Sequence, residues 1–293
     1  MMLMKREKIS LIRSPAPMVI NVVSTTFLSI IFGVIFFDVG RGDRANSLVV
    51  QAQLGAVVNI LISTMMGQSQ TALVIFSSER SLFLREYSTN HYSIVTYFLS
   101  HLMTEALQAL SAVLVQVWAL GFLEKLSINC LVPYLPVRST VKQALIVYWM
   151  IGFQMYFLEF LAITYCLSMT STAVSVLLGA MVSDIKSASA LFTLVVVPQF
   201  YFSGVFIATN LIPIWVRWAQ YTTSLKYAAG LAFIYEFGNC GDAVSQANCD
   251  DVLAQNGVST DDLWWYWLAL AALFVSFRGM ALYVLHRKGK DFF

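Results

Sequence analysis

Charge is scarce in this sequence. Aspartate, glutamate, lysine and arginine make up 12% of its 293 residues and hydrophobic residues 58%, whereas a typical soluble chain has about 25% charged residues. The mean hydropathy is +0.72. So few charges cannot cover a water-facing surface, which excludes a soluble protein. We therefore expect an all-α, multi-pass integral membrane protein.

The motifs of soluble catalysis are also missing. The sequence has no GxxxxGK[ST] phosphate loop, no HExxH and no GxSxG. Its four cysteines have no CxxC spacing, and none of its three histidines has a second metal ligand on one helical face. The net charge of +2, without a long basic run, argues against a nucleic-acid partner. We expect no catalytic residue, metal site or cofactor within this chain.

Apolar stretches long enough to cross a bilayer, about 20 residues each, recur along the chain. The expected spans are 18–37, 48–76, one that begins near Tyr97, one within 144–182, 188–207 and 263–285. Basic residues exceed acidic ones before the first span and after the last, whereas the segment 208–262 is acidic. Basic flanks stay in the cytoplasm, so we expect both termini inside and 208–262 outside. This orientation requires an even number of spans, and six fits.

The two polar flanks have distinct expected forms. Residues 1–17 mix apolar and basic side chains, which suits an amphipathic helix on the inner membrane surface. Residues 212–237 carry tryptophan and tyrosine at near-helical spacing, which suits a helical segment that re-enters the outer leaflet. Cys240 and Cys249 fall on the oxidising side, so we expect a disulfide, with two free thiols as the alternative.

Four ordered blocks of sequence carry a family resemblance, and the first is the entry into the first span at residues 11–40. Residues 79–100 have the form E-R-x-x-F-x-R-E-x-x-x-x-x-Y-x-x-x-x-Y-F. Residues 177–207 contain Pro198 and the FSG run at 202–204, and residues 212–237 resemble the form IPxWxxWxxYxSxxKYA, with Thr223 at the serine position. Together they resemble the membrane domain of G-subfamily ATP-binding-cassette transporters, of the white and pleiotropic drug resistance type. Gly230 and Tyr235 depart from that family's pattern.

This resemblance implies a fold and a function. The chain would be one ABC-2 type transmembrane domain (1–293) with about six spans, a cytoplasmic coupling helix and an outer re-entrant segment. It would export lipids, sterols or other amphipathic compounds as a homo- or heterodimer, in the plasma membrane or an internal membrane. ATP and Mg would bind a nucleotide-binding domain in the same polypeptide or a separate chain, so this chain alone would be no enzyme. The alternative is an ATPase-less membrane scaffold or regulatory subunit.

The block after the second span would couple the membrane domain to the ATPase. The residues that the resemblance assigns to this contact are Glu79, Arg80, Phe83, Arg85 and Glu86. A solvated loop with ordinary charge pairs is the alternative. The resemblance also implies a substrate path lined by the second and fifth spans, for which we name Asn59, Thr64, Val195 and Phe202. Ordinary helix packing is the alternative for each of these four.

Polar groups inside the spans carry two further expectations. Glu105 and Glu159 should face the bundle or be protonated, Glu105 with a basic partner such as Arg85. Each could serve a proton relay or an interhelical hydrogen bond. The polar side chains of the second span would face a second protomer, or else pack inside one bundle; they are Gln51, Gln53, Asn59, Thr64, Gln68 and Gln70.

The third span is longer than the resemblance predicts. Residues 117–143 contain two prolines and four charges, which suit no span interior. Removing them would leave an uninterrupted apolar helix. We therefore expect an insertion here, such as an intron retained in the gene model, and a transcript sequence would decide this.

Overall fold

The computed structural model describes most of the chain outside its N-terminal fifth and a central segment. The described residues are 31, 35–36, 39, 42, 44–88, 95–103, 105–106, 151–182, 184–204, 206, 212–240 and 243–290. Within them the fold is all-helical, without strands. The expected amphipathic helix at 1–17, most of the first span and the proposed insertion at 117–143 lie outside the described residues.

Four helices of the described part are long and apolar enough to cross a membrane. They are α3 (Ser47–Ser88), α6 (Phe157–Met181), α7 (Ile185–Phe202) and α10 (Leu263–Lys290). They correspond to the expected second, fourth, fifth and last spans. Residues 95–103 and 105–106, at the start of the expected third span, are also helical. The total of six spans stays a prediction.

Helix α3 runs further than the apolar run that predicted it. Its membrane-compatible part is Ser47–Ser78, but the helix continues without a break to Ser88. The added sequence, ERSLFLREYS, contains good helix formers and neither glycine nor proline. The first part of the block expected to couple to an ATPase is therefore the end of a spanning helix.

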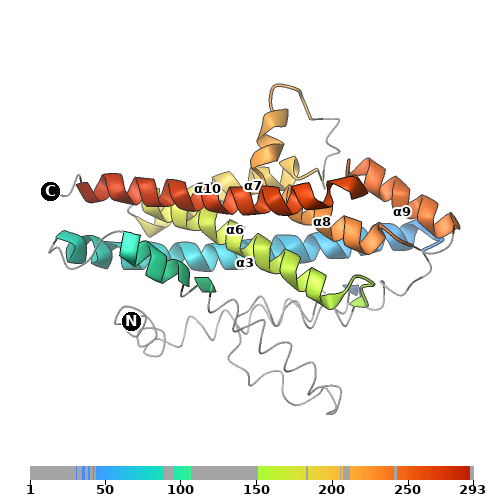
Figure 1. The fold of residues 1–293 in the computed structure, drawn as a ribbon, viewed down its shortest axis with the longest axis horizontal. Coiled ribbons are helices and arrows are strands. Elements are labelled where there is room, and N and C mark those ends of the chain that lie inside the picture. Colours follow the sequence, from blue (N-terminus) through green and yellow to red (C-terminus); the bar gives the residue numbers. More distant parts are fainter. Residues whose placement is uncertain are drawn as a thin grey trace, which may run out of the picture.

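Helix α6 lies at the centre of the described bundle. It lies between α3 and α10 (Figure 1), and it has its most extensive contacts with these two helices. Many of its buried residues are serine or threonine, whose hydroxyls donate to carbonyls of the same helix. Thr164 donates to Phe160 O at 2.9 Å, and Ser171 donates to Ser168 O at 2.9 Å. Because these small side chains are satisfied within α6, neighbouring helices can approach it closely.

A short helix, α8 (Ser224–Phe237), is packed against α3, α6 and α10. It has 14 residues, too few to span a bilayer, and 11 of them are buried. The 3₁₀ helix η4 (Arg217–Thr222) precedes it, where Trp215 and Trp218 are exposed. A buried short helix after exposed aromatics is compatible with a re-entrant segment, which stays a prediction because no membrane is present.

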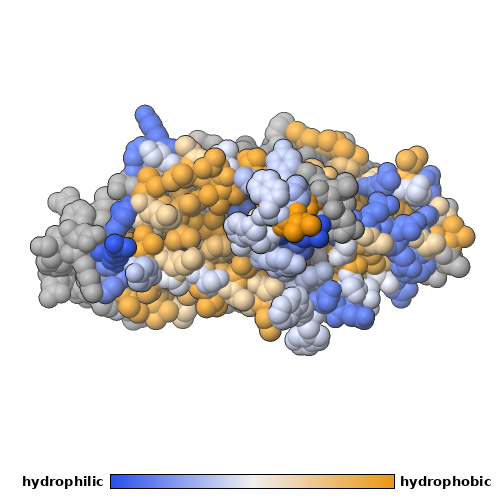
Figure 2. All heavy atoms as spheres, turned by 90° about the horizontal axis from the view of Figure 1, so that it is seen from above, coloured by the Kyte–Doolittle hydropathy of each residue, from blue (hydrophilic) through white to orange (hydrophobic). Residues whose placement is uncertain are grey.

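The remaining helix, α9 (Ala243–Gln255), covers one end of the bundle. It contacts α8 and α3, and the turn η5 (Thr260–Asp262) then leads into α10. Seen from above (Figure 2), a broad apolar surface occupies much of the face, and hydrophilic side chains gather at the end where α9 lies. This distribution suits a chain with an apolar belt and a water-facing cap.

Close contact between α8 and α10 predicts a position-specific effect of volume. A Cβ at Gly230 would lie 3.0 Å from Cε2 of Tyr266, whereas a Cβ at Gly279 on α10 would meet nothing within 4 Å. We expect Gly230→Val to lower the free energy of unfolding by about 1–3 kcal/mol more than Gly279→Val, because the tyrosine must shift. Thermal unfolding of the detergent-solubilised full chain measures this difference. Equal losses for the two variants would contradict the packing described.

Candidate functional site

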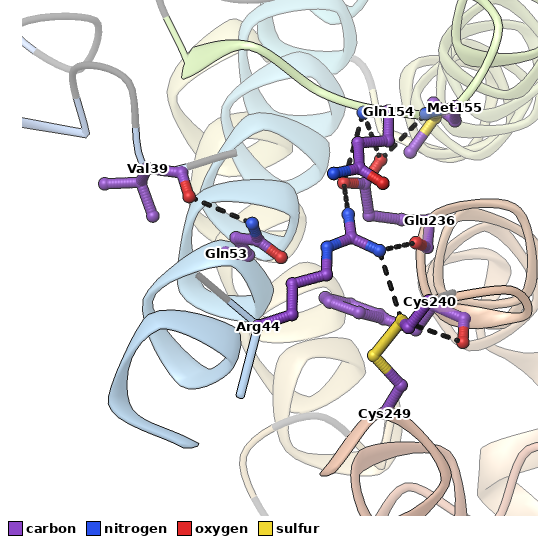
Figure 3. Close-up of polar contacts among 9 residues, drawn as sticks. Val39, Arg44, Gln53, Gln154, Met155, Glu236, Cys240 and Cys249 are labelled. Atoms are coloured by element: carbon purple, nitrogen blue, oxygen red, sulfur yellow. Dashed lines mark hydrogen bonds and ion pairs between the residues drawn. A yellow bond between two sulfur atoms is a disulfide. The ribbon is translucent and has the colours of Figure 1, made fainter. Parts of the chain in front are cut away.

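A buried ion pair joins two segments that are far apart in the sequence. Arg44 Nη2 lies 2.7 Å from Glu236 Oε1, and the two residues are 5% and 1% exposed. Arg44 Nη1 also donates to the backbone oxygen of Glu236 at 2.9 Å. Figure 3 shows this guanidinium between the end of α8 and the turn that precedes α3.

Glu236 holds a third segment as well. Its carboxylate accepts hydrogen bonds from the backbone N–H of Gln154 at 3.1 Å and of Met155 at 3.1 Å, in the loop that leads into α6. Burial lowers the pKa of Arg44 and raises the pKa of Glu236, while their mutual attraction and the two amide hydrogen bonds to Glu236 oppose these shifts. One carboxylate thus connects α8 to the starts of α3 and α6.

The disulfide lies beside this ion pair. The structure joins Cys240 to Cys249, the pair that the sequence singled out. Arg44 Nη1 lies 3.1 Å from Cys240 Sγ. Asn248 Nδ2 donates to the backbone oxygens of Arg44 at 3.1 Å and Ala45 at 2.9 Å. Because of these contacts, α9 is fastened both to the end of α8 and to the turn before α3.

This cluster of Arg44, Glu236 and the Cys240–Cys249 disulfide is the arrangement that sequence reasoning missed. From the sequence, Glu236 entered only as one of the acidic residues of the segment 208–262, and Arg44 was not singled out. A signal did exist, because Glu236 is the lone charge in the apolar run GLAFIYEF. A buried carboxylate in such a run needs a cation, and Arg44 is the partner.

A second ion pair lies among the spans. Arg278 of α10 donates to Glu105 through Nη2, and His101 Nδ1 lies 3.6 Å from the other carboxylate oxygen. The rings of Phe274 and Phe98 flank the guanidinium at 5.6 Å and 5.9 Å. The sequence suggested a basic partner for Glu105 from the same side of the membrane, with Arg85 as the example.

That example is replaced by Arg278, which is 173 residues from Glu105. Packing of α10 along α6 brings it there, and the side chain of Arg85 lies outside the described part. Glu159, the other intramembrane carboxylate named, is half-buried in the first turn of α6. A negative charge at a helix N-terminus is electrostatically favourable, so Glu159 sits at the edge of the span.

Two residues assigned to the ATPase contact face the membrane domain instead. Arg80 and Phe83 are 5% and 1% exposed, and Phe83 stacks on Tyr97 with ring centroids 4.2 Å apart. These two side chains pack against the membrane domain because α3 continues as a helix and turns them toward its neighbours, and their role in a contact with an ATPase stays a prediction. The side chains of Glu79, Arg85 and Glu86 lie outside the described part, and their role stays a prediction.

The four substrate-path residues are not equivalent in the structure. Thr64 is 2% exposed and packs inside the chain, which favours ordinary helix packing, the alternative named for it. Asn59, Val195 and Phe202 are half-buried. Among the polar residues of α3, Gln53 and Gln68 are also buried inside the chain. Gln51 and Gln70 are exposed. Three of these six polar residues therefore pack within one chain.

The ion pair between Arg44 and Glu236 predicts strong energetic coupling between the two residues. We expect Arg44→Met or Glu236→Gln alone to lower the free energy of unfolding by about 3–5 kcal/mol, because each leaves one buried charge without its counter-charge. The double variant should lose clearly less than the sum. Thermal unfolding of the four proteins forms the double-mutant cycle, and Glu159→Gln at the edge of α6 is the matched control. Additive losses would contradict the described pair.

Comparison with known proteins places this architecture in a family. The family model for ABC-2 type transporters matches residues 1–132 and 126–237. The chain is 22% identical to ABC transporter G family member 1 of Dictyostelium discoideum, over 100% of this chain and 35% of that protein. It is 23% identical to the protein white of Drosophila melanogaster, over 97% of this chain and 39% of that protein.

A third relative is the broad substrate specificity ATP-binding cassette transporter ABCG2 of Mus musculus. It is 22% identical over 93% of this chain and 40% of its own length. The chain thus spans about two-fifths of the length of these relatives. The family match over most of the chain, with helices that can span a membrane, shows that the chain belongs to the ABC-2 type transporter family.

Proposed function

We propose that this chain is the membrane half of an ATP-driven exporter of lipids, sterols or other amphipathic compounds. The observation that carries this proposal is the alignment of the whole chain with about two-fifths of proteins named as ATP-binding cassette transporters. The sequence has no phosphate loop of its own. ATP and Mg would therefore bind a nucleotide-binding domain, in the same polypeptide or in a separate chain.

The proposed passage lies along α7. Only Ala188, Phe192 and Val196 of this helix are buried, so one narrow stripe attaches it to the rest of the chain. Leu194 and Tyr201, by contrast, are 70% and 52% exposed. A span with so little of its surface covered is the best candidate for a wall shared with a second half-transporter.

We place the substrate between such walls. Val195 and Phe202 of α7 and Asn59 of α3 are half-buried and remain our candidates for the path, whereas Thr64 is withdrawn because it is enclosed. Apolar and aromatic side chains suit flat amphipathic ligands through adaptable packing. The proposed orientation has both termini in the cytoplasm and α9 outside, which is the side where a disulfide persists.

Transport by the full-length protein in proteoliposomes tests the function. We expect ATP-dependent movement of rhodamine 123 or of a nitrobenzoxadiazole-labelled phosphatidylserine. Phe202→Ala should raise the KM for the transported probe by at least about fivefold, because apolar contact area is lost. Tyr283→Ala, at an exposed tyrosine of α10, is the matched control and should leave KM unchanged. Absence of ATP-dependent movement of any amphipathic probe, in protein that hydrolyses ATP, would reject the function.

Cross-linking tests the dimer. In a background with Cys130 and Cys166 replaced by alanine, Leu194→Cys should give oxidative cross-links between protomers. Val275→Cys on α10 is the control, because it is 66% exposed, close to the 70% of Leu194. Cross-links at position 275 but not at 194 would mean that α10, and not α7, faces the partner.

A further inference from the structure

The C-terminus of α6 is held by cations from two other helices. The last four carbonyls of a helix have no partner within it, and the last turn of α6 contains no basic residue. Arg80 Nη1 of α3 donates to Gly179 O at 3.3 Å and to Val182 O at 2.5 Å. Lys288 Nζ of α10 donates to Met181 O. Two helices thus provide the cap that α6 lacks.

Close packing brings Arg80 to this place. A Cβ at Gly179 would lie 3.0 Å from Phe76 Cδ1 and 3.2 Å from Ser77 Oγ. Helices α3 and α6 therefore approach each other closely where residue 179 has no side chain. Phe76 and Arg80 are one turn apart on α3, so the guanidinium reaches over the end of α6.

Arg80 forms no ion pair with any described carboxylate, although its side chain is buried. Burial lowers the pKa of Arg80. The negative end of the α6 dipole and the carbonyl oxygens are the groups that stabilise this buried cation. A lysine would supply the charge but not the planar fork of the guanidinium.

The capped end of α6 also determines where α7 begins. Met181 ends α6 and Ile185 begins α7, so only three residues connect the two helices. Asp184 caps α7 by accepting from the N–H of Ser187 at 3.2 Å. Helix α7 buries few of its own residues and packs on both α3 and α6, so the short connection from α6 contributes to its position at this end. A change in the position of α3 near Arg80 would displace α7 through this short connection.

The same stretch of α3 contacts the segment 95–106. Phe76 meets His101 edge to face, with ring centroids 5.6 Å apart, and Phe83 stacks on Tyr97. The stretch of α3 from residue 76 to 83 therefore lies between the end of α6 and the segment that follows the expected coupling block. A displacement of that block would therefore be passed to α6 through the contacts of Phe76 and Arg80.

We propose that Arg80 is a positioning residue of the transport cycle, which holds the C-terminus of α6 so that movement of the coupling end of α3 is passed to α7. Lys288 of α10 supports the same end of α6 by donating to a different carbonyl, Met181 O. This inference rests on the proposed function, but it assigns Arg80 to a contact within the membrane domain and not to the ATPase surface.

Hydrogen exchange tests the contact without reference to transport. In the full-length protein in lipid nanodiscs, Arg80→Met should speed exchange of the last turn of α6 and the turn 182–184 by about five- to thirtyfold. Arg80→Lys should have a smaller effect. Lys186→Met is the matched control, because Lys186 is an exposed cation at the same end of α7 and should change nothing there. Unchanged exchange in Arg80→Met would overturn the proposal.

The ratio of transport to ATP hydrolysis tests the role. With rhodamine 123 as the probe, Arg80→Met should keep ATP hydrolysis and lower transport per ATP by about tenfold, because α7 no longer follows α3. Arg80→Lys should restore part of the ratio, and Lys186→Met should match the wild type. A proportional fall of both activities, or an unchanged ratio, would overturn the positioning role. Absence of ATP-dependent transport in the wild type would instead reject the proposed function.

Discussion

The ion pair between Arg44 and Glu236 determines how one end of this bundle is assembled. Two charges that are almost fully removed from water must satisfy each other, and the carboxylate here also accepts two backbone amides. The starts of α3 and α6 and the end of α8 meet at this point, and Asn248 and the disulfide hold α9 beside them. The positions of these four helices at this end of the bundle therefore depend on the buried contact between Arg44 and Glu236.

Helix α6 provides the corresponding constraint along the bundle. Its buried hydroxyls are satisfied by carbonyls of their own helix, so it presents small side chains to both α3 and α10. At its far end Gly179 allows close contact with α3, and cations from α3 and α10 meet its last carbonyls. Charged side chains thus bind both ends of α6, whose own sequence carries little charge. Helix α7 is attached by only three buried residues. This difference is the physical basis for our proposal that α7 is the helix that moves during transport.

Apolar run length was sufficient to predict α3, α6, α7 and α10, because a bilayer requires about 20 apolar residues whatever their partners. The ordered motifs were sufficient for the family. The pairings were not predictable, since Arg44 and Glu236 are 192 residues apart and Glu105 and Arg278 are 173 apart. A single sequence shows which charges need partners but not which partners the fold provides. The burial of Arg80 was also not predictable, because the charged motif gives no sign that the helix that carries it continues past the apolar run.

Hydrogen exchange across the outer end of the bundle tests the central claim most directly. If the carboxylate of Glu236 holds three segments together, Glu236→Gln should raise exchange rates at the start of α3, at residues 154–160 and at the end of α8 by a similar factor. Exchange near the middle of α10 should stay unchanged in the same protein. Faster exchange at the end of α8 alone, with the other two segments still protected, would show that these segments are held independently and would contradict the account.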